Sequence, residues 1–549
     1  MTSSTILYQW VVRWIVVTAV VQALAVNGMS SERHHSALRL SSNMEIEEPS
    51  NEFEYMHVIR RVYGKQNAQV RETASNLMNR IERFQTGLPG DPNHIVPYEN
   101  HPFDHATRRQ LKTNGTNMNI LYQPIRIKFF TFALDSIRNS TNSAGIDWFI
   151  STILPLAGNF WSQALSVVPV SGNLVISAAE LDQRMYCGDP SLSKVPAEHM
   201  STGVPDVDLI LYVSGSDNPM FCAPETLAVA VPCNFDQFDR PTAGAINVCL
   251  GNIHLQSDGT ASSALVTSYK DVTMHEICHV LGLTSDTFRF YWNPNTGQPR
   301  TPRPFAITEV TCVTGQNQTI ALPANNTVVL TDDDVGRRYA IIVTERVRAV
   351  ARNQFNCQSL LGGNLENEPT NPASCLGDHW DERLFFPELM TPVISLTTSF
   401  LSPITLAILE DSGWYIANYT QSVVTPWGLG AGCDFVNAKC LNVSSSATTV
   451  PDFNRGYFCS VENEKGCSQG FTHKMACTIL DYSYFVPQTP PPAEFQYFPN
   501  APSKGGPVTA DWCPVYETPY NSMSVAQLDC RDPSNANQLS SGGSLNVYR

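Results

Sequence analysis

Residues 274–282, Met-His-Glu-Ile-Cys-His-Val-Leu-Gly, constrain the fold of this chain more than any other stretch. Residues four apart on an α-helix lie on the same face, one turn from each other. His275 and His279 therefore present two imidazoles that can bind one Zn²⁺. Glu276 lies beside them, where a carboxylate can take a proton from a metal-activated water. The pattern predicts a zinc-binding helix, with Gly282 supplying a sharp turn at its end.

An exposed helix with two unrelated histidines is the alternative interpretation of this motif. The neighbouring residues argue against it, because most are apolar and predict a buried helix: Val272, Met274, Ile277, Val280, Leu281 and Leu283. Burial of two imidazoles and a carboxylate without polar partners costs free energy. A bound metal removes that cost, so we favour a zinc site.

The third ligand must come from elsewhere in the chain. A catalytic zinc takes three protein ligands and keeps a fourth position for water. The extended form of the motif places a histidine six residues after the second one, but that residue is Ser285 here. His379 is the candidate, because Met390 follows it shortly, in Glu-Leu-Met-Thr-Pro, where a methionine turn beneath the zinc is expected. Taken singly, the histidine would more often be a surface residue and the methionine a core residue. The pair in this order after the helix is much less expected by chance.

The N-terminus indicates export. An apolar stretch from Trp10 to Val26 contains Ala23-Leu24-Ala25, which is typical of a signal-peptide cleavage site, so residues 1–25 are predicted to be removed. A retained signal anchor is the alternative, since no Lys or Arg precedes the stretch. We expect a secreted, extracellular protein without stable membrane insertion. The polar residues 540–549 give no lipid-anchor signal, and the formal charge of −15 argues against nucleic-acid partners.

The 15 cysteines fit secretion, because they imply disulfides, and none precedes Cys187. The odd count leaves one cysteine over, for which Cys278 is the candidate because it lies inside the zinc helix. Six N-x-S/T sequons are candidate glycosylation sites: Asn114, Asn139, Asn317, Asn325, Asn418 and Asn442.

The domain organisation follows from changes of pattern along the chain. Residues 26–109 are polar and end at the dibasic pair Arg108-Arg109, which predicts a propeptide cleaved there; a plain N-terminal subdomain is the alternative. Residues 110–283 are predicted to form the N-terminal catalytic subdomain. Residues 284–429 form a central subdomain, and residues 430–549 a cysteine-rich C-terminal domain.

Within these domains the elements are predicted from periodicity. Apolar residues at helical spacing predict a helix within 148–168, and acidic residues after Thr331 predict a helix from there to about Asn353. The zinc helix is expected over 263–283, and strands over 125–130, 208–214, 227–232 and 243–250.

These motifs together resemble the leishmanolysin, or invadolysin, metalloproteases, which have an H-E-x-x-H-x-x-G helix, a long insertion, a late histidine and a Met-turn. The resemblance covers roughly residues 117–530. The segments that carry it are 206–213, the zinc helix, 354–357, 379–392, 404–415, 427–440 and 511–514.

The resemblance implies an α+β fold: a metzincin-type catalytic domain with a mixed sheet, an inserted central subdomain and a disulfide-rich C-terminal domain. It implies one Zn²⁺ bound by His275, His279 and His379, with Glu276 as general base and Met390 in the Met-turn. It also suggests the disulfides Cys187–Cys233, Cys357–Cys433 and Cys440–Cys513. Substrates would be proteins or peptides, including extracellular-matrix or cell-surface proteins, and would pair in extended form with the strand at 227–231.

The chain departs from the family pattern in two places. Family propeptides often inhibit through a cysteine that binds the zinc, but no cysteine precedes Cys187. His34-His35 lies in a similar place and offers another ligand. The Gly-rich stretch that often precedes the late histidine is replaced by the stiffer residues 366–375.

Two rival functions follow from the same residues. An inactive adhesion or binding protein on this scaffold would usually lose Glu276 or a ligand, and this chain keeps them. A zinc-stabilised structural module would close the fourth zinc position and would need no glutamate beside the first histidine. The residues therefore favour a secreted zinc endopeptidase.

Overall fold

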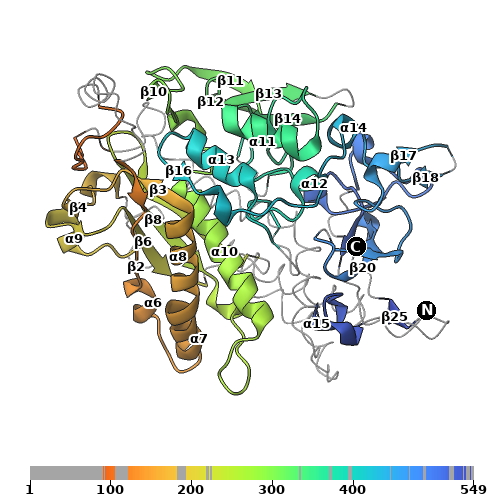
Figure 1. The fold of residues 1–549 in the computed structure, drawn as a ribbon, viewed down its shortest axis with the longest axis horizontal. Coiled ribbons are helices and arrows are strands. Elements are labelled where there is room, and N and C mark those ends of the chain that lie inside the picture. The colour runs from red at the N-terminus through yellow and green to blue at the C-terminus, as the bar shows by residue number, and fades with distance from the viewer. Residues whose placement is uncertain are drawn as a thin grey trace, which may run out of the picture.

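The structure is a computed structural model with a mixed α/β fold (Figure 1). It describes residues 91, 93–104, 121–181, 193–217, 222, 226–332, 336–369, 374–393, 399–445, 447–468, 470–485, 490–517, 525–535, 537–538 and 544–545. Several predictions lie outside the described residues: the signal peptide, most of the propeptide, His34, His35, Arg108, Arg109, Asn114 and Cys187.

A four-stranded sheet is the frame of the first half of the chain. Strands β2 (Ile127–Phe130), β6 (Leu209–Ser214) and β8 (Pro241–Val248) run parallel in that order, and β7 (Ala228–Phe235) pairs antiparallel with β8 at the edge. All four strands predicted from the sequence in this part are confirmed, with small shifts at their ends.

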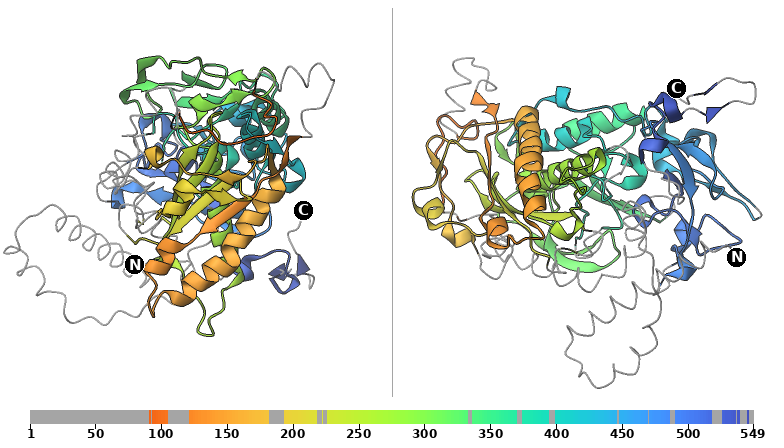
Figure 2. Two further views of the ribbon diagram at one scale, coloured as in Figure 1. Left: turned by 90° about the vertical axis from the view of Figure 1, so that its left-hand side faces the viewer. Right: turned by 90° about the horizontal axis from the view of Figure 1, so that it is seen from below.

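Both faces of this sheet are covered. Successive side chains of a strand point to opposite faces, and in β6 Leu209 and Leu211 join the main core while Ile210 and Tyr212 join a second cluster. Helix α10 (Ser263–Leu281) packs over β7 and β8, and α8 (Leu154–Ala164) packs against α10 (Figures 1 and 2). Helix α10 is therefore enclosed between the sheet and the rest of the core.

The predicted helix at 148–168 is part of a longer helical segment. It consists of α7 (Ser143–Trp148), a π-helical turn (Phe149–Ile153) and α8. The segment ends at Ala164, earlier than predicted, and continues as β3 (Leu165–Val167), which pairs with β1 (Gln123–Pro124) and β16 (Ile416–Ala417). The run Val-Val-Pro at 167–169 explains the early end, because β-branched residues and the residue before proline disfavour helix.

Residues 93–104, near the end of the predicted propeptide, pack against the folded body. Val96 and Phe103 are buried. The Tyr98 hydroxyl donates to Asp236, and the ring of His101 stacks on Phe238 at 3.9 Å between centroids. This segment therefore covers the turn between β7 and β8.

The helix predicted to begin at Thr331 is wrong in its first half. Residues Val328–Asp332 form β13 and Arg338–Ile342 form β14, which also pairs with β15 (Gly363–Asn364); helix α11 begins only at Glu345 and ends at Phe355. Its acidic cap comes from α13 (Pro403–Asp411), because the Asp411 carboxylate accepts from the backbone N–H groups of residues 346 and 347 at 2.8 and 3.2 Å. A tertiary contact thus replaces the local cap that the sequence offered.

The C-terminal region has short elements stapled by disulfides. It includes α14 (Cys433–Asn437) and the sheet β19 (Lys465–Cys467), β20 (Lys474–Thr478) and β23 (Val515–Glu517). The predicted pairs Cys357–Cys433 and Cys440–Cys513 are confirmed. The structure adds the pairs Cys222–Cys249, Cys312–Cys375 and Cys459–Cys477.

Cys278 is free and buried in α10, as predicted, but it is not the single cysteine left over, because Cys467 and Cys530 are also free. The third predicted pair cannot be placed, because Cys187 lies outside the described residues.

No helix among the described residues is both long enough and apolar enough to cross a membrane. The remaining helices and strands are α6 (Phe132–Ser136), β4 (Asn173–Leu174), α9 (Ala197–Ser201), β5 (Val204–Pro205), β9 (Trp292–Asn293), β10 (Gln298–Pro299), β11 (Ile307–Thr311), β12 (Asn317–Ala321), α12 (Glu382–Phe385), β17 (Asn442–Val443), β18 (Thr448–Thr449), β21 (Leu480–Asp481), β22 (Lys504–Gly505), α15 (Val525–Leu528), β24 (Asn537–Gln538) and β25 (Ser544–Leu545).

Candidate metal centre

Helix α10 is fixed at both ends by its own sequence. At its start the Ser262 hydroxyl accepts from the backbone N–H of Leu265 at 3.1 Å. At its end Gly282 adopts a φ of +120°, and a Cβ there would lie 2.6 Å from the Trp414 ring. The helix therefore stops where the motif predicted, with both of its histidines in the last two turns.

The three predicted ligands meet at one point. The Nε2 atom of His279 lies 3.0 Å from that of His275 and 3.3 Å from that of His379, and the remaining pair is 3.2 Å apart. His275 and His379 are buried, and His279 is partly exposed. The long separation between the zinc helix and His379 along the chain is thus closed by the fold.

The other ring nitrogen of each histidine faces an acceptor. Nδ1 of His275 lies 2.7 Å from the carbonyl of Leu389, and Nδ1 of His279 lies 2.7 Å from the carbonyl of Leu283. Nδ1 of His379 lies 2.8 Å from Oε1 of Glu366. Since these oxygens accept, the Nδ1 atoms carry the protons, and the Nε2 atoms point lone pairs at one another.

A zinc ion fits this arrangement. Three converging lone pairs repel one another unless a cation lies between them. Four-coordinate zinc with Zn–N distances of about 2.0–2.1 Å separates its nitrogen ligands by about 3.3 Å, close to the spacings found here. The donor set, three imidazole nitrogens, is that of a catalytic zinc site with a fourth position left over.

Burial and mutual repulsion favour the neutral form of the two helix histidines. Burial lowers the pKa of His275 well below its usual value, and the neighbouring His279 and His379 lower it further. Burial, again followed by repulsion from His379, lowers the pKa of His279 to about 4. For His379 burial lowers the pKa, but the attraction of Glu366 outweighs it, so the net shift is upward.

Glu276 lies next to the first ligand with its side chain almost enclosed. It is buried, and burial raises the pKa of its carboxyl to about 8, against the opposing attraction of His379. None of the described residues hydrogen-bonds to its carboxylate. A desolvated carboxylate without a competing partner is suited to take up a proton.

Met390 is fully buried in the turn that supports two of the ligands. The carbonyl of Leu389 accepts a hydrogen bond from Nδ1 of His275. The carbonyl of Met390 accepts from the backbone N–H of Trp380, the residue after His379, at 2.9 Å. The structure therefore places the predicted Met-turn against both parts of the site.

Glu388 holds this turn and was not predicted. It is 1% exposed, and its carboxylate accepts from the backbone N–H groups of Met390 and Ser402 and from the Thr405 hydroxyl. Burial raises its pKa to about 7, and these hydrogen bonds oppose the rise. A glutamate two residues before the methionine is the only local signal, since its other partners lie beyond residue 400.

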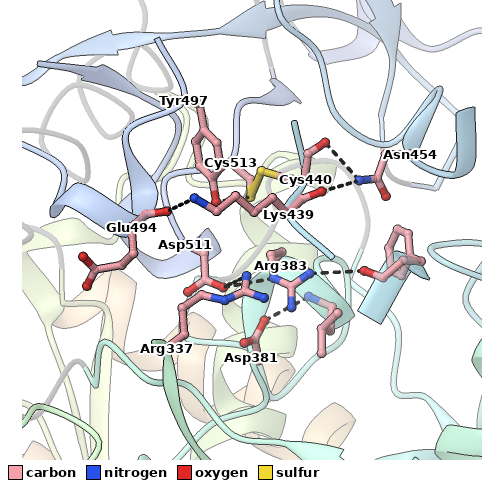
Figure 3. Close-up of a disulfide and its surroundings, with 12 residues drawn as sticks. Arg337, Asp381, Arg383, Lys439, Cys440, Asn454, Glu494, Tyr497, Asp511 and Cys513 are labelled. Atoms are coloured by element: carbon pink, nitrogen blue, oxygen red, sulfur yellow. Dashed lines mark hydrogen bonds and ion pairs between the residues drawn. A yellow bond between two sulfur atoms is a disulfide. The ribbon is translucent and has the colours of Figure 1, made fainter. Parts of the chain in front are cut away.

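The residues after His379 reach into the C-terminal region (Figure 3). The Asp381 carboxylate accepts from the backbone N–H of Leu384 at the start of α12. Arg383 donates from Nε to Asp511 at 3.0 Å, and Arg337 lies 3.4 Å from the same carboxylate oxygen, all three side chains being 1% exposed. This buried ion cluster lies beside the Cys440–Cys513 disulfide and joins the ligand-bearing segment to the C-terminal region.

The five predicted glycosylation sites within the described residues are all exposed: Asn139, Asn317, Asn325, Asn418 and Asn442. Their side chains are therefore accessible to a modifying enzyme.

Comparison with known proteins agrees with this site. A leishmanolysin family model matches residues 142–548. A leishmanolysin-like peptidase of Drosophila pseudoobscura pseudoobscura is 28% identical over 435 residues, which is 68% of this chain and 60% of the relative. One from Caenorhabditis elegans is 27% identical over 484 residues, 77% of this chain and 70% of the relative. Leishmanolysin of Leishmania major is 28% identical over 382 residues, 69% of this chain and 52% of the relative.

The sheet, the zinc-type helix and the converging histidines define a metallopeptidase class of fold. The chain belongs to the leishmanolysin family of peptidases, as its motifs indicated. It spans between about half and 70% of the length of these three relatives.

Proposed function

We propose that this protein is a secreted zinc-dependent endopeptidase with a metzincin-type catalytic domain. The observation that carries the proposal is the convergence of three Nε2 lone pairs within 3.3 Å beside the buried Glu276. His275, His279 and His379 would hold the zinc. When bound, zinc polarises the scissile carbonyl and lowers the pKa of the attacking water.

Glu276 would be the general base in this reaction. Its carboxylate takes the proton of the attacking water and then passes it to the nitrogen of the leaving amine. Burial favours the protonated form of this group between the two transfers.

The substrate would be a protein or peptide chain in extended form. Edge strand β7 (Ala228–Phe235) packs against α10 and lies at the end of the sheet order, so a peptide paired with it would run along the zinc helix. This strand overlaps the segment 227–231 expected from the sequence. Extracellular-matrix and cell-surface proteins are the substrate class that secretion would expose to it.

The domain boundaries belong to the same proposal: an N-terminal catalytic subdomain at 110–283, a central one at 284–429 and a C-terminal domain at 430–549. A propeptide within 26–109 would keep the enzyme latent. Residues 93–104 pack into the body, so cleavage at Arg108-Arg109 would leave them held by noncovalent contacts alone. We propose processing at Arg108-Arg109, which N-terminal sequencing of the secreted form tests.

Proteolysis of a denatured protein by the purified, processed chain tests the function. We expect Glu276→Gln to lower the rate by about 10²- to 10⁴-fold with its zinc content unchanged, and a chelator to abolish cleavage. Glu462→Gln, an exposed glutamate paired with Lys504, is the matched control and should cleave like the wild type. A zinc-loaded wild type that cleaves nothing would instead support a binding protein on this scaffold.

A further inference from the structure

His379, the third ligand, is positioned by a different kind of contact from the other two ligands. His275 and His279 share the rigid helix α10, whereas His379 follows a loop, residues 374–378, without regular structure. A histidine on such a loop must have its ring orientation and its backbone position fixed by other groups. Two carboxylates, Glu366 and Asp378, make those contacts.

Glu366 holds the ring and the backbone of His379 together. It is 1% exposed, and its Oε1 accepts both from Nδ1 of His379 at 2.8 Å and from the backbone N–H of Asp378 at 2.9 Å. Its own backbone N–H donates to the carbonyl of His379 at 2.9 Å. The ring therefore has one orientation, with Nε2 directed to the other histidines.

Asp378 ties the same loop to the end of the zinc helix. Its Oδ1 accepts from the backbone N–H of Ser285 at 2.7 Å and from the Thr284 hydroxyl at 3.1 Å. The Ser285 hydroxyl makes a second contact with the loop, to Ser374 at 3.1 Å. Ser285 occupies the position where the extended motif places the third histidine. Here that position anchors the loop that brings the histidine from elsewhere.

The loop is shaped for these contacts. Gly377 has a φ of +81°, and a Cβ there would lie 2.5 Å from the carbonyl oxygen of Glu366. On its other side the loop is tied by the Cys312–Cys375 disulfide and by a bond from the Val313 N–H to the Cys375 carbonyl. The loop thus closes directly on Glu366.

We propose that Glu366 and Asp378 are a pair of positioning residues that preorganise His379 for the metal. Glu366 sets the orientation and basicity of the imidazole, and Asp378 sets the distance between its loop and α10. Groups of this kind typically change metal affinity by about 10- to 100-fold when removed. The proposal rests on the proposed function only for the identity of the metal.

Zinc affinity measured by competition with a chromophoric chelator tests it on the purified full chain. We expect Glu366→Ala and Asp378→Ala each to raise the zinc dissociation constant about 10- to 100-fold. Asp378→Asn keeps an acceptor oxygen for both donors and should restore most of the affinity. Asp332→Ala, which removes an exposed carboxylate paired with Arg338, is the control and should bind zinc like the wild type.

Cobalt separates positioning from a general loss of fold. The visible absorption of the Co²⁺-loaded protein reports ligand number and geometry, and it should change in both alanine variants while the metal-free protein still shows a cooperative thermal transition. Thr284→Val removes one donor to Asp378 at nearly constant shape, and it should weaken zinc binding in the same direction by a smaller factor. If Asp378→Ala does not fold, Thr284→Val tests the role of Asp378 in its place.

The proposal would be overturned if Glu366→Ala and Asp378→Ala bound zinc like the wild type and showed an unchanged cobalt spectrum. Thr284→Val takes the place of Asp378→Ala in this comparison if the latter does not fold. If the wild type binds zinc and the variants weaken it as expected, but no variant cleaves protein, the positioning role stands and the proposed function fails.

Discussion

The two parts of the metal centre are built by different means. Helix α10 obtains its start, its end and the relative placement of His275 and His279 from residues within a single local segment. The segment of His379 obtains its position from contacts with residues outside it: Glu366, Ser285 and, through Arg383, Asp511 in the C-terminal region. Changes in the C-terminal region should therefore alter the position of His379 and leave the positions of His275 and His279 unchanged.

Removal of Asp511 should give the largest effect. Asp511→Ala leaves the buried Arg383 and Arg337 without their shared counter-ion, so we expect a loss of about 3–5 kcal/mol in the free energy of unfolding. Denaturant unfolding of the zinc-loaded chain measures it. Asp452→Ala, which removes an exposed partner of Arg455, is the control and should change little. Equal stability of the two variants would show that the C-terminal region does not support the site.

Removal of the disulfide beside this cluster should cost somewhat less. Cys440→Ser with Cys513→Ser opens a cross-link with a sequence separation of 73 residues, and we expect a loss of about 2–4 kcal/mol. Hydrogen exchange should show the loss of protection in residues 374–393 and not in α10. Equal loss of protection in α10 would argue that the two parts of the site unfold as one unit.

Removal of the cap of α10 tests the part of the site that is determined locally. Ser262→Ala deletes the hydroxyl that caps α10, so we expect a loss of about 1 kcal/mol in unfolding free energy, with zinc affinity kept. Ser262→Asp retains an acceptor and should behave like the wild type. A tenfold loss of zinc affinity in Ser262→Ala would contradict the view that the ligand pair is fixed by the buried end of the helix.

Acid should also destabilise the fold, through His101 in the segment that covers the β7–β8 turn. Burial, followed by repulsion from Arg240, lowers the pKa of His101 to about 3. The unfolded chain binds this proton near pH 6.5, so the stabilisation is complete above that pH and is lost as the pH falls from 6.5 toward 3. We expect His101→Phe to lose less stability than the wild type between pH 7 and 5, as measured by denaturant unfolding. Parallel pH profiles would indicate that residues 93–104 are not part of the folded body.

The sequence could predict the part of the site that is determined locally, and it could predict less of the part that depends on tertiary contacts. The spacing of His275, Glu276 and His279 is a local pattern, so helix, ligands and base followed from it directly. His379 and Met390 could be predicted only as a pair and only by their order after the helix. Glu366 and Glu388 were missed because most of their partners lie 12 to 17 residues away, outside any helix or strand periodicity.

The errors in the fold have the same cause. The acidic run after Thr331 resembled a helix start, but the cap of α11 comes from Asp411 in another helix. The packing of residues 93–104 was likewise not predicted, because the core partners of Val96 and Phe103 lie far along the chain. Local propensity predicts an element correctly only where tertiary contacts do not override it.

X-ray absorption at the zinc edge of the purified chain tests the central claim that histidines from both parts of the molecule hold one metal. The account predicts one zinc per chain with three imidazole nitrogens and one further light ligand at about 2.0–2.1 Å, and one imidazole fewer in His379→Ala. A sulfur ligand in the wild type, or an unchanged number of imidazoles in His379→Ala, would contradict it.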